Sequence, residues 1–229
     1  MIEYRTIRTA ASHEIVIKKS RFICNISQAF TKKEAEDFIS KISKQHYKST
    51  HNCVAYQIGN HNEEQKAIDN GEPSGTAGIP MLEVLKQNDL KNVVCVVTRY
   101  FGGIKLGTGG LVRAYSHSVN EAIKSIGIIE RCLRIPLSLQ VDYTLSGKVD
   151  YWIANSSYSL TNTNYLEKVT YTLDIPPKEL DQVKLDLTNL TNAHVTFTIG
   201  QEHYVAVSYT HLTLPTKLEW CRSRWSPYH

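Results

Sequence analysis

Two glycine-rich segments contain the residues whose types and spacing could form a binding or catalytic site. The first is DNGEPSGTAGIP, residues 69–80, and the second is TRYFGGIKLGTGGLVRAY, residues 98–115. Eight of the twelve glycines lie between Gly71 and Gly110. Glycine lets a loop adopt positive φ or lets another group approach the backbone closely, at a cost in folding entropy. Two tight turns would account for these glycines, but we favour a shared pocket or recognition surface.

The first segment carries side chains suited to acid–base chemistry. Asp69 or Glu72 could act as an acid or base, with the hydroxyls of Ser74 and Thr76 nearby. Asp-Asn-Gly is equally ordinary turn chemistry, and the sequence places no His or Lys base beside Ser74. His51 ends a predicted strand and is a further candidate, although a lone histidine is more often structural. We therefore assign no catalytic residue and lean against an enzyme, with a hydrolase-like use of this loop left open.

The second segment has the order strand, glycine-rich loop, helix. This order presents backbone N–H groups and the positive end of a helix dipole to an anion. Tyr100 or Phe101 is available to stack on a base. The candidate ligands of a phosphate or nucleic acid are Arg99, Lys105 and Arg113, with Gly102, Gly103, Gly107, Gly109 and Gly110.

The second segment fits neither nucleotide fingerprint. GIKLGTGG lacks the GK[ST] ending of a P-loop, and Val112 stands where GxGxxG needs its last glycine. An ATPase or dinucleotide enzyme is therefore not expected, and no cofactor is predicted. A basic turn at Lys18, Lys19 and Arg21 is either solvated or a further contact to phosphate.

The composition is that of a globular protein. The 229 residues are 41% hydrophobic and 21% charged, and the five cysteines show no CxxC or Cys/His metal spacing, so no metal is predicted. No secretory leader and no apolar run of about 18 residues occurs, which favours a cytosolic protein and no membrane partner. Residues 1–133 carry 18 Lys/Arg against 13 Asp/Glu, whereas residues 134–204 carry 5 against 8. The basic first part favours a polyanionic partner.

Hydrophobic periodicity predicts an α+β protein with a first domain at residues 1–133. Thr31 and Glu34 form a capping box that starts a helix ending near residue 45. The continuous apolar run at residues 92–98 indicates a strand buried on both faces. The other expected elements are strands at 4–9, 14–26, 51–58 and 128–135 and helices at 78–90 and 110–126.

Pro136 marks an expected linker, after which the pattern changes. Residues 136–204 follow the order β-α-β-β-α-β, which is ferredoxin-like. This domain has no glycine cluster and no nucleophile with a base, so we interpret it as a binding or regulatory module. Residues 206–229 lack sustained periodicity, and VSYTHLTLPT resembles translated sequencing-adapter DNA. We interpret this tail as a sequence artefact that the fold does not need.

DNGEPSGTAGIPMLEVL and VVTRYFGGIKLGTGGLVRAY, together with HNCVAYQIG at residues 51–59, resemble the Impact/YigZ family in its bacterial two-domain form. The resemblance covers residues 1–204. It implies a first domain similar to the second domain of a small-subunit ribosomal protein. It also implies a ferredoxin-like domain similar to those of elongation factor G. Eukaryotic relatives regulate translation through a partner protein, but this chain lacks their extra N-terminal domain.

Three functions stay open at this point. The leading hypothesis is a non-enzymatic, translation-linked regulator that binds RNA or the ribosome. The alternatives are a protein-interaction module without nucleic acid, for example with a translation-regulating protein, and an enzyme. We expect the two glycine-rich loops to face each other across one cleft. Glu72 or Ser74 should then lie within reach of Arg99, Lys105 or Arg113.

Overall fold

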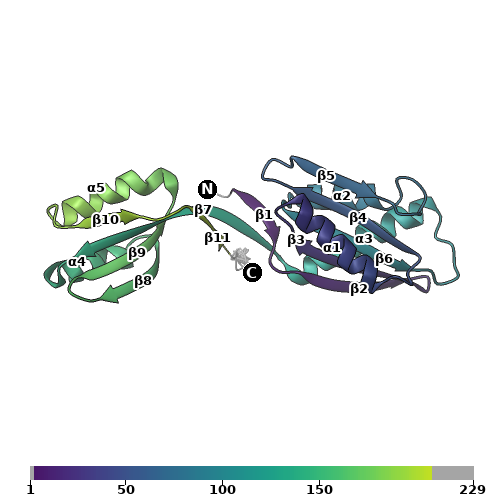
Figure 1. Ribbon diagram of the computed structural model, residues 1–229, viewed down its shortest axis with the longest axis horizontal. Coiled ribbons are helices and arrows are strands. Elements are labelled where there is room, and N and C mark those ends of the chain that lie inside the picture. The colour runs from purple at the N-terminus through teal and green to yellow at the C-terminus, as the bar shows by residue number, and fades with distance from the viewer. Residues whose placement is uncertain (1–2, 208–229) are drawn as a thin grey trace, which may run out of the picture.

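The chain forms two lobes joined by one long strand, β7 (Ile128–Val141) (Figure 1). The computed structural model describes residues 3–207. The first half of β7 pairs with β1 (Tyr4–Ile7) and β11 (His203–Val207), and the second half pairs with β9 (Val169–Ile175) and β10 (Thr196–Ile199). All four pairings are antiparallel. Strand β7 therefore forms backbone hydrogen bonds in both lobes.

The N-terminal lobe is built on a five-stranded antiparallel sheet with β6 at its centre. Every residue of β6 except its last is buried, as the apolar run predicted. The strand order is β2 (Ala11–Ile17), β3 (Ser20–Gln28), β6 (Val93–Tyr100), β4 (His51–Ile58) and β5 (Glu64–Ile68).

Helices cover both faces of this sheet. Helix α1 (Lys32–Gln45) packs on the face that carries Val94 and Val96. Helices α2 (Gly78–Gln87) and α3 (Thr108–Ile126) pack on the opposite face, against Val93, Cys95 and Val97. The alternation of side chains along β6 thus supplies both cores.

The start of α1 follows the predicted capping box with one difference. The Glu34 N–H donates to Thr31 Oγ1 at 3.2 Å, as expected. The Glu34 carboxylate, however, accepts from the N–H of Phe30 at 2.8 Å instead of from that of Thr31. Both side chains still satisfy backbone donors at the helix start, which is the physical purpose of the motif.

The C-terminal lobe has the expected order β-α-β-β-α-β. Its sheet order is β10-β7-β9-β8, and its core gathers Leu137, Leu139, Tyr171 and Leu173 with Val183 and Leu187 of the second helix. Its remaining elements are α4 (Tyr143–Ala154), β8 (Ser159–Tyr165), the 3₁₀ turn η1 (Pro177–Glu179) and α5 (Leu180–Leu190).

Pro136 lies inside β7 and not in a linker loop. It stands opposite Asp174 of β9. On the other edge of β7, β10 ends opposite Leu137 and β11 begins opposite Arg134. Proline has no backbone N–H to donate, and at this gap between two strands only its carbonyl is used, which accepts from the Gly200 N–H at 2.8 Å. The domain boundary at residues 133–136 stays a prediction, and the backbone there is part of the continuous strand β7.

The stretch predicted as one strand at residues 14–26 forms two, β2 and β3, because the chain turns at Lys18 and Lys19. Two further strands, β5 and β11, were not predicted. In β5, EQKAI, four of five residues are exposed, so no hydrophobic period marks it. The short β11 was missed because it overlaps the supposed tail: Ala206 and Val207 pair with Arg131 and Glu130. Residues 208–229 of that tail lie outside the described residues. Among residues 3–207, no helix is long and apolar enough to cross a membrane.

We expect β11 to contribute measurable stability. Tyr204 packs edge-to-face on Tyr4 with ring centroids 5.3 Å apart, and such a pair alone contributes about 0.5–1.5 kcal/mol. A chain ending at Glu202 should therefore unfold at a lower temperature than one ending at Val207. The shift should be at least about 2–4 °C for each kcal/mol lost, as seen by calorimetry. Equal midpoints for the two truncated chains would show that β11 adds nothing.

Candidate functional site

The two glycine-rich loops meet around one cavity of about 360 Å³, which we call the central cavity. The first loop contributes Glu72 and Pro73, and the second contributes Phe101 and Lys105. The remaining wall comes from the ends of β4 and β6 and the first turns of α3, namely Thr50, His51, Arg99, Leu106, Gly107, Thr108 and Leu111.

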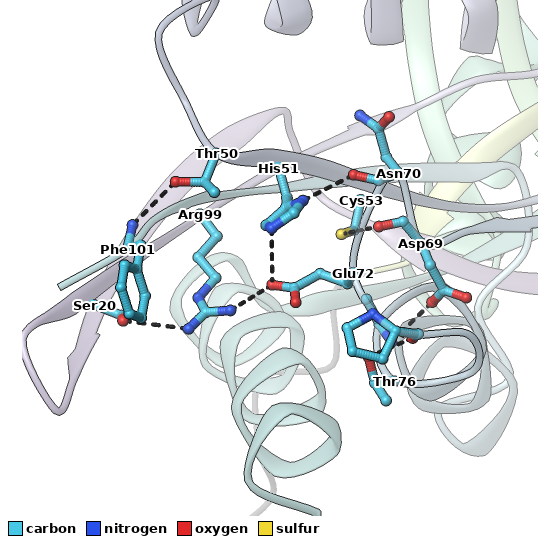
Figure 2. Close-up of polar contacts among 12 residues, drawn as sticks. Ser20, Thr50, His51, Cys53, Asp69, Asn70, Glu72, Thr76, Arg99 and Phe101 are labelled. Carbon is cyan, nitrogen blue, oxygen red and sulfur yellow. Dashed lines mark hydrogen bonds and ion pairs between the residues drawn. The ribbon is translucent and has the colours of Figure 1, made fainter. Parts of the chain in front are cut away.

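A buried ion pair forms part of the cavity wall (Figure 2). Arg99 Nη1 lies 2.6 Å from Glu72 Oε1, and the two side chains are only 6% and 3% exposed. The Arg99 guanidinium also packs between the rings of Phe22 and Phe101, 5.3 and 5.5 Å from their centroids. Arg99 is thus held by the protein itself. Removing either partner would leave a buried charge unpaired, at a cost of about 3–5 kcal/mol.

His51 extends this cluster. In the β4–β6 register it stands directly opposite Arg99. Its Nδ1 lies 3.0 Å from the Asn70 carbonyl. A carbonyl only accepts, so Nδ1 carries the proton. Figure 2 shows the other ring nitrogen, Nε2, directed at Glu72, 3.9 Å from Oε1. A protonated His51 would therefore form a second ion pair with the same carboxylate.

Cys53 and Tyr115 complete the cluster but supply no nucleophile. Burial raises the pKa of Cys53 to about 12, so its thiol stays protonated at neutral pH. The thiol donates to the Asp69 carbonyl at 2.9 Å. Burial likewise raises the pKa of Tyr115, and its phenol donates to Glu72 Oε1 at 2.9 Å. Both groups orient the cluster as hydrogen-bond donors.

Asp69 holds the first loop together and does not face an acid–base partner. Its carboxylate accepts from the backbone N–H groups of Gly75 at 2.7 Å, Ala77 at 2.9 Å and Gly78 at 2.8 Å. Burial acts to raise the pKa of Asp69, but these three donors outweigh it and the pKa is lowered. Thr76 is also internal to the loop, since its hydroxyl donates to the Pro73 carbonyl at 2.7 Å. Ser74 is exposed.

The candidate glycines divide into three roles. A Cβ at Gly102 would overlap the backbone of Lys19 and Ser20, so this position needs glycine for close packing. Gly103 and Gly107 have φ of +85° and +71°, which favours glycine. Gly109 and Gly110 lie in the first turn of α3, which begins at Thr108 and not near Gly110 as expected.

The three candidate cations do not form one cluster. Arg99 is in the buried ion pair, and Lys105 lines the central cavity. Arg113 lines a separate groove of about 620 Å³, which we call the basic groove. The cause is the helical period: Arg113 follows the cavity-facing Leu111 by two residues, or about 200° around α3. Lys18 of the β2–β3 turn lies in the same groove as Arg113.

Sequence reasoning missed Cys53 and Tyr115 as members of the cluster. Both side chains are fully buried, as apolar core residues are. The alternation in β4 puts His51 and Cys53 on one face, which was the available signal. Among residues 3–207, no group of three or more His, Cys, Asp or Glu side chains is placed to hold a metal ion.

Comparison with protein families gives two matches. A family model described as the Impact N-terminal domain matches residues 18–123, which include both glycine-rich loops. A second, described as a domain of unknown function (DUF1949), matches residues 139–194 in the C-terminal lobe.

Similar proteins and a solved structure extend over most of the chain. The IMPACT family member YvyE of Bacillus subtilis (strain 168) is 47% identical over 209 residues, covering 91% of this chain and 96% of that protein. The IMPACT family member YigZ of Escherichia coli (strain K12) is 38% identical, covering 62% and 74%. Protein IMPACT of Homo sapiens is 28% identical, covering 49% and 40%. A crystal structure titled as that of a hypothetical protein aligns with a TM-score of 0.57 and 27% identity, covering 88% of this chain and 98% of that one.

Replacing Asp69 should reduce stability at neutral pH and flatten its dependence on acid. A lowered pKa means that the carboxylate stabilises the fold above its ordinary value of 3.8 and loses that effect as the pH falls through the folded value. Asp69→Asn should therefore be about 1–2 kcal/mol less stable at pH 7, with a smaller loss on going to about pH 3. Urea unfolding at both pH values measures this, with the exposed Asp89→Asn as control. Parallel pH profiles for wild type and Asp69→Asn would contradict the assignment.

Two glycine substitutions should separate packing from helix propensity. Gly102→Ala forces the loop away from the β2–β3 turn and should cost about 1–3 kcal/mol, as overpacking does. A Cβ at Gly109 meets nothing within 4 Å, so Gly109→Ala should leave stability unchanged or raise it by up to about 1 kcal/mol. Thermal unfolding of both variants decides the matter. A Gly102→Ala protein as stable as Gly109→Ala would mean that the close approach is not needed.

Proposed function

The chain belongs to the Impact family, and from its basic groove we propose that it is a translation-linked, RNA-binding protein without enzymatic activity. The RNA backbone would lie along the groove between the β2–β3 turn and α3. The observation that carries this proposal is the convergence of two cationic side chains there, Lys18 from the turn and Arg113 from α3. His117, one turn further along α3, adds a ring N–H that can donate to a phosphate oxygen. All three are exposed, as phosphate contacts must be.

The β2–β3 turn supports this proposal through its strained backbone. Lys18 and Lys19 have φ of 44° and 66°. A two-residue hairpin turn of this kind ordinarily uses Asn-Gly or Gly-Gly, and each non-glycine residue in this region costs of the order of 1–3 kcal/mol. Two lysines at such positions favour a role for their charges. The close packing of Gly102 against Lys19 fixes the turn beside the second glycine-rich loop.

The surroundings of the groove fit a nucleic acid better than a simple anion. Leu106 lines both the basic groove and the central cavity, so the two are neighbours. Phe101, which is 48% exposed, and Lys105 lie on the cavity side. An aromatic ring beside cations is the usual arrangement for binding single-stranded RNA.

The link to translation is part of this proposal and rests on the family. Resemblance to the Impact family implies a first domain similar to one in a small-subunit ribosomal protein and a second similar to domains of elongation factor G. We propose a cytosolic location on the same ground. The fold by itself carries no function, so the groove and its charges are the argument for RNA.

Removing a groove cation should weaken RNA binding and its salt dependence together. Each phosphate contact on a single strand contributes about −0.7 to the slope of log K against log salt. Lys18→Ala and Arg113→Ala should each make the slope shallower by about that amount. Fluorescence anisotropy with a single-stranded RNA at several salt concentrations measures this.

Lys41→Ala is the charge-matched control, since Lys41 is an exposed residue of α1 on the opposite face of the sheet. It should bind RNA like the wild type. Equal slopes for Lys18→Ala, Arg113→Ala and Lys41→Ala would exclude the groove as the phosphate site. Absence of RNA binding by the wild type would overturn the proposal in favour of a protein-interaction module.

A further inference from the structure

Two buried charged side chains line the central cavity, and the proposed RNA groove uses neither of them. Glu72 and Arg99 are almost completely buried, and together they line a cavity large enough for a small molecule. A buried ion pair is costly to desolvate and is often no more stable than a hydrophobic replacement. Charges kept at a cavity wall therefore point to ligand recognition.

Two atoms of this pair lack partners among residues 3–207. Glu72 Oε1 receives Arg99 and Tyr115, which fix the carboxylate in place. Its second oxygen, Oε2, makes no hydrogen bond to the described residues, and neither does Arg99 Nε. A carboxylate held in place in this way, with one oxygen free, is suited to accept a hydrogen bond from a ligand hydroxyl.

The start of α3, which also lines the cavity, is suited to an anion. Thr108 begins the 19-residue helix α3, whose N-cap, Gly107, offers no side-chain cap. The first N–H groups of the helix thus have no intrahelical partner, and the helix dipole favours negative charge there. Lys105, whose side chain is exposed, adds a cation to the cavity lining. The two positive charges of Lys105 and Arg99 outnumber the single negative charge of Glu72, so the cavity lining carries a net positive charge.

Phe101 provides a flat surface next to these groups. One face of its ring is held by the Arg99 guanidinium, 5.5 Å from the centroid. The side chain is 48% exposed, so it remains open to a ligand. Any of the four nucleobases can stack on such a ring, because each has a flat π face.

We infer that the central cavity binds a nucleoside monophosphate. Its phosphate lies at the start of α3 with Lys105, a ribose hydroxyl donates to Glu72 Oε2, and the base stacks on Phe101. The same chemistry occurs in a free nucleotide and at the 5′-phosphorylated end of an RNA. The inference goes beyond the proposed function, because it requires none of the groove cations.

Isothermal titration of the full chain with AMP tests the site. Lys105→Ala and Phe101→Ala should each weaken AMP binding by about tenfold, the effect expected for one phosphate contact or one stacked base. Both are exposed side chains, and an unchanged thermal midpoint confirms that each variant is folded. Lys41→Ala is again the control. No heat of binding with AMP at millimolar concentration, or affinities unchanged in both variants, would overturn the inference.

The ligand itself tests the role of Glu72 without disturbing the buried cluster. AMP that lacks the 2′ and 3′ hydroxyls should bind at least about tenfold more weakly, because it leaves Oε2 without a donor. Inorganic phosphate should bind more weakly still, since it offers neither hydroxyl nor base. Equal affinity for AMP and its dideoxy form would show that Glu72 does not bind the ribose hydroxyls.

A competition experiment separates the two sources of the nucleotide. Displacement of AMP by a 5′-phosphorylated RNA, and not by the same RNA with a 5′ hydroxyl, would assign the cavity to RNA ends. Displacement by neither RNA would assign it to a free nucleotide, and displacement by both equally would contradict recognition of a terminal phosphate. Arg113→Ala should leave AMP affinity unchanged, so failure of the groove proposal and failure of this one give different results.

Discussion

The N-terminal lobe depends on the ion pair between Arg99 and Glu72. It joins the end of the central strand β6 to the first glycine-rich loop, and its partners Tyr115 and His51 bring in helix α3 and strand β4. Four segments distant in the sequence therefore share one carboxylate. Because both side chains are excluded from water, their attraction is weakly screened, and either one alone would be strongly unfavourable. The geometry of the cavity wall follows from this constraint.

The glycines of the N-terminal lobe have different structural roles. Gly102 lets the second loop lie directly on the β2–β3 turn, and Gly78 lets α2 start against the backbone of β5. These two positions serve packing, whereas Gly103 and Gly107 serve the path of the loop. A cluster of glycines in a sequence thus does not mean that each one faces a ligand. In this lobe they mainly allow close backbone packing, at Gly78 and Gly102, and positive φ, at Gly103 and Gly107.

Local sequence patterns predicted the elements that depend on local physics. The capping residues of α1, the doubly buried β6 and the β-α-β-β-α-β order all follow from periodicity and short-range hydrogen bonds. The contact between Glu72 and Arg99 was expected from the facing loops and is confirmed. The position of His51 beside this pair was not expected, because it depends on the β4–β6 register that places His51 opposite Arg99. Asp69 was ambiguous between catalysis and turn formation, and only the distances to three backbone N–H groups resolve it. Arg113 was misplaced because it lies about 200° around α3 from Leu111, which lines the central cavity.

Continuity of β7 has a mechanical consequence. A protein whose lobes are joined by a loop can bend at that loop through changes in a few φ and ψ angles. Here the backbone passes from one sheet into the other while hydrogen-bonded to neighbours on both sides of Pro136. Rotation of one lobe against the other must be absorbed as torsion spread along a twisted ribbon, not as bending at a hinge. Such a ribbon has a preferred twist angle and resists departure from it. The distance between the two lobes is therefore nearly fixed, and so is the distance between any two surfaces that the lobes bind.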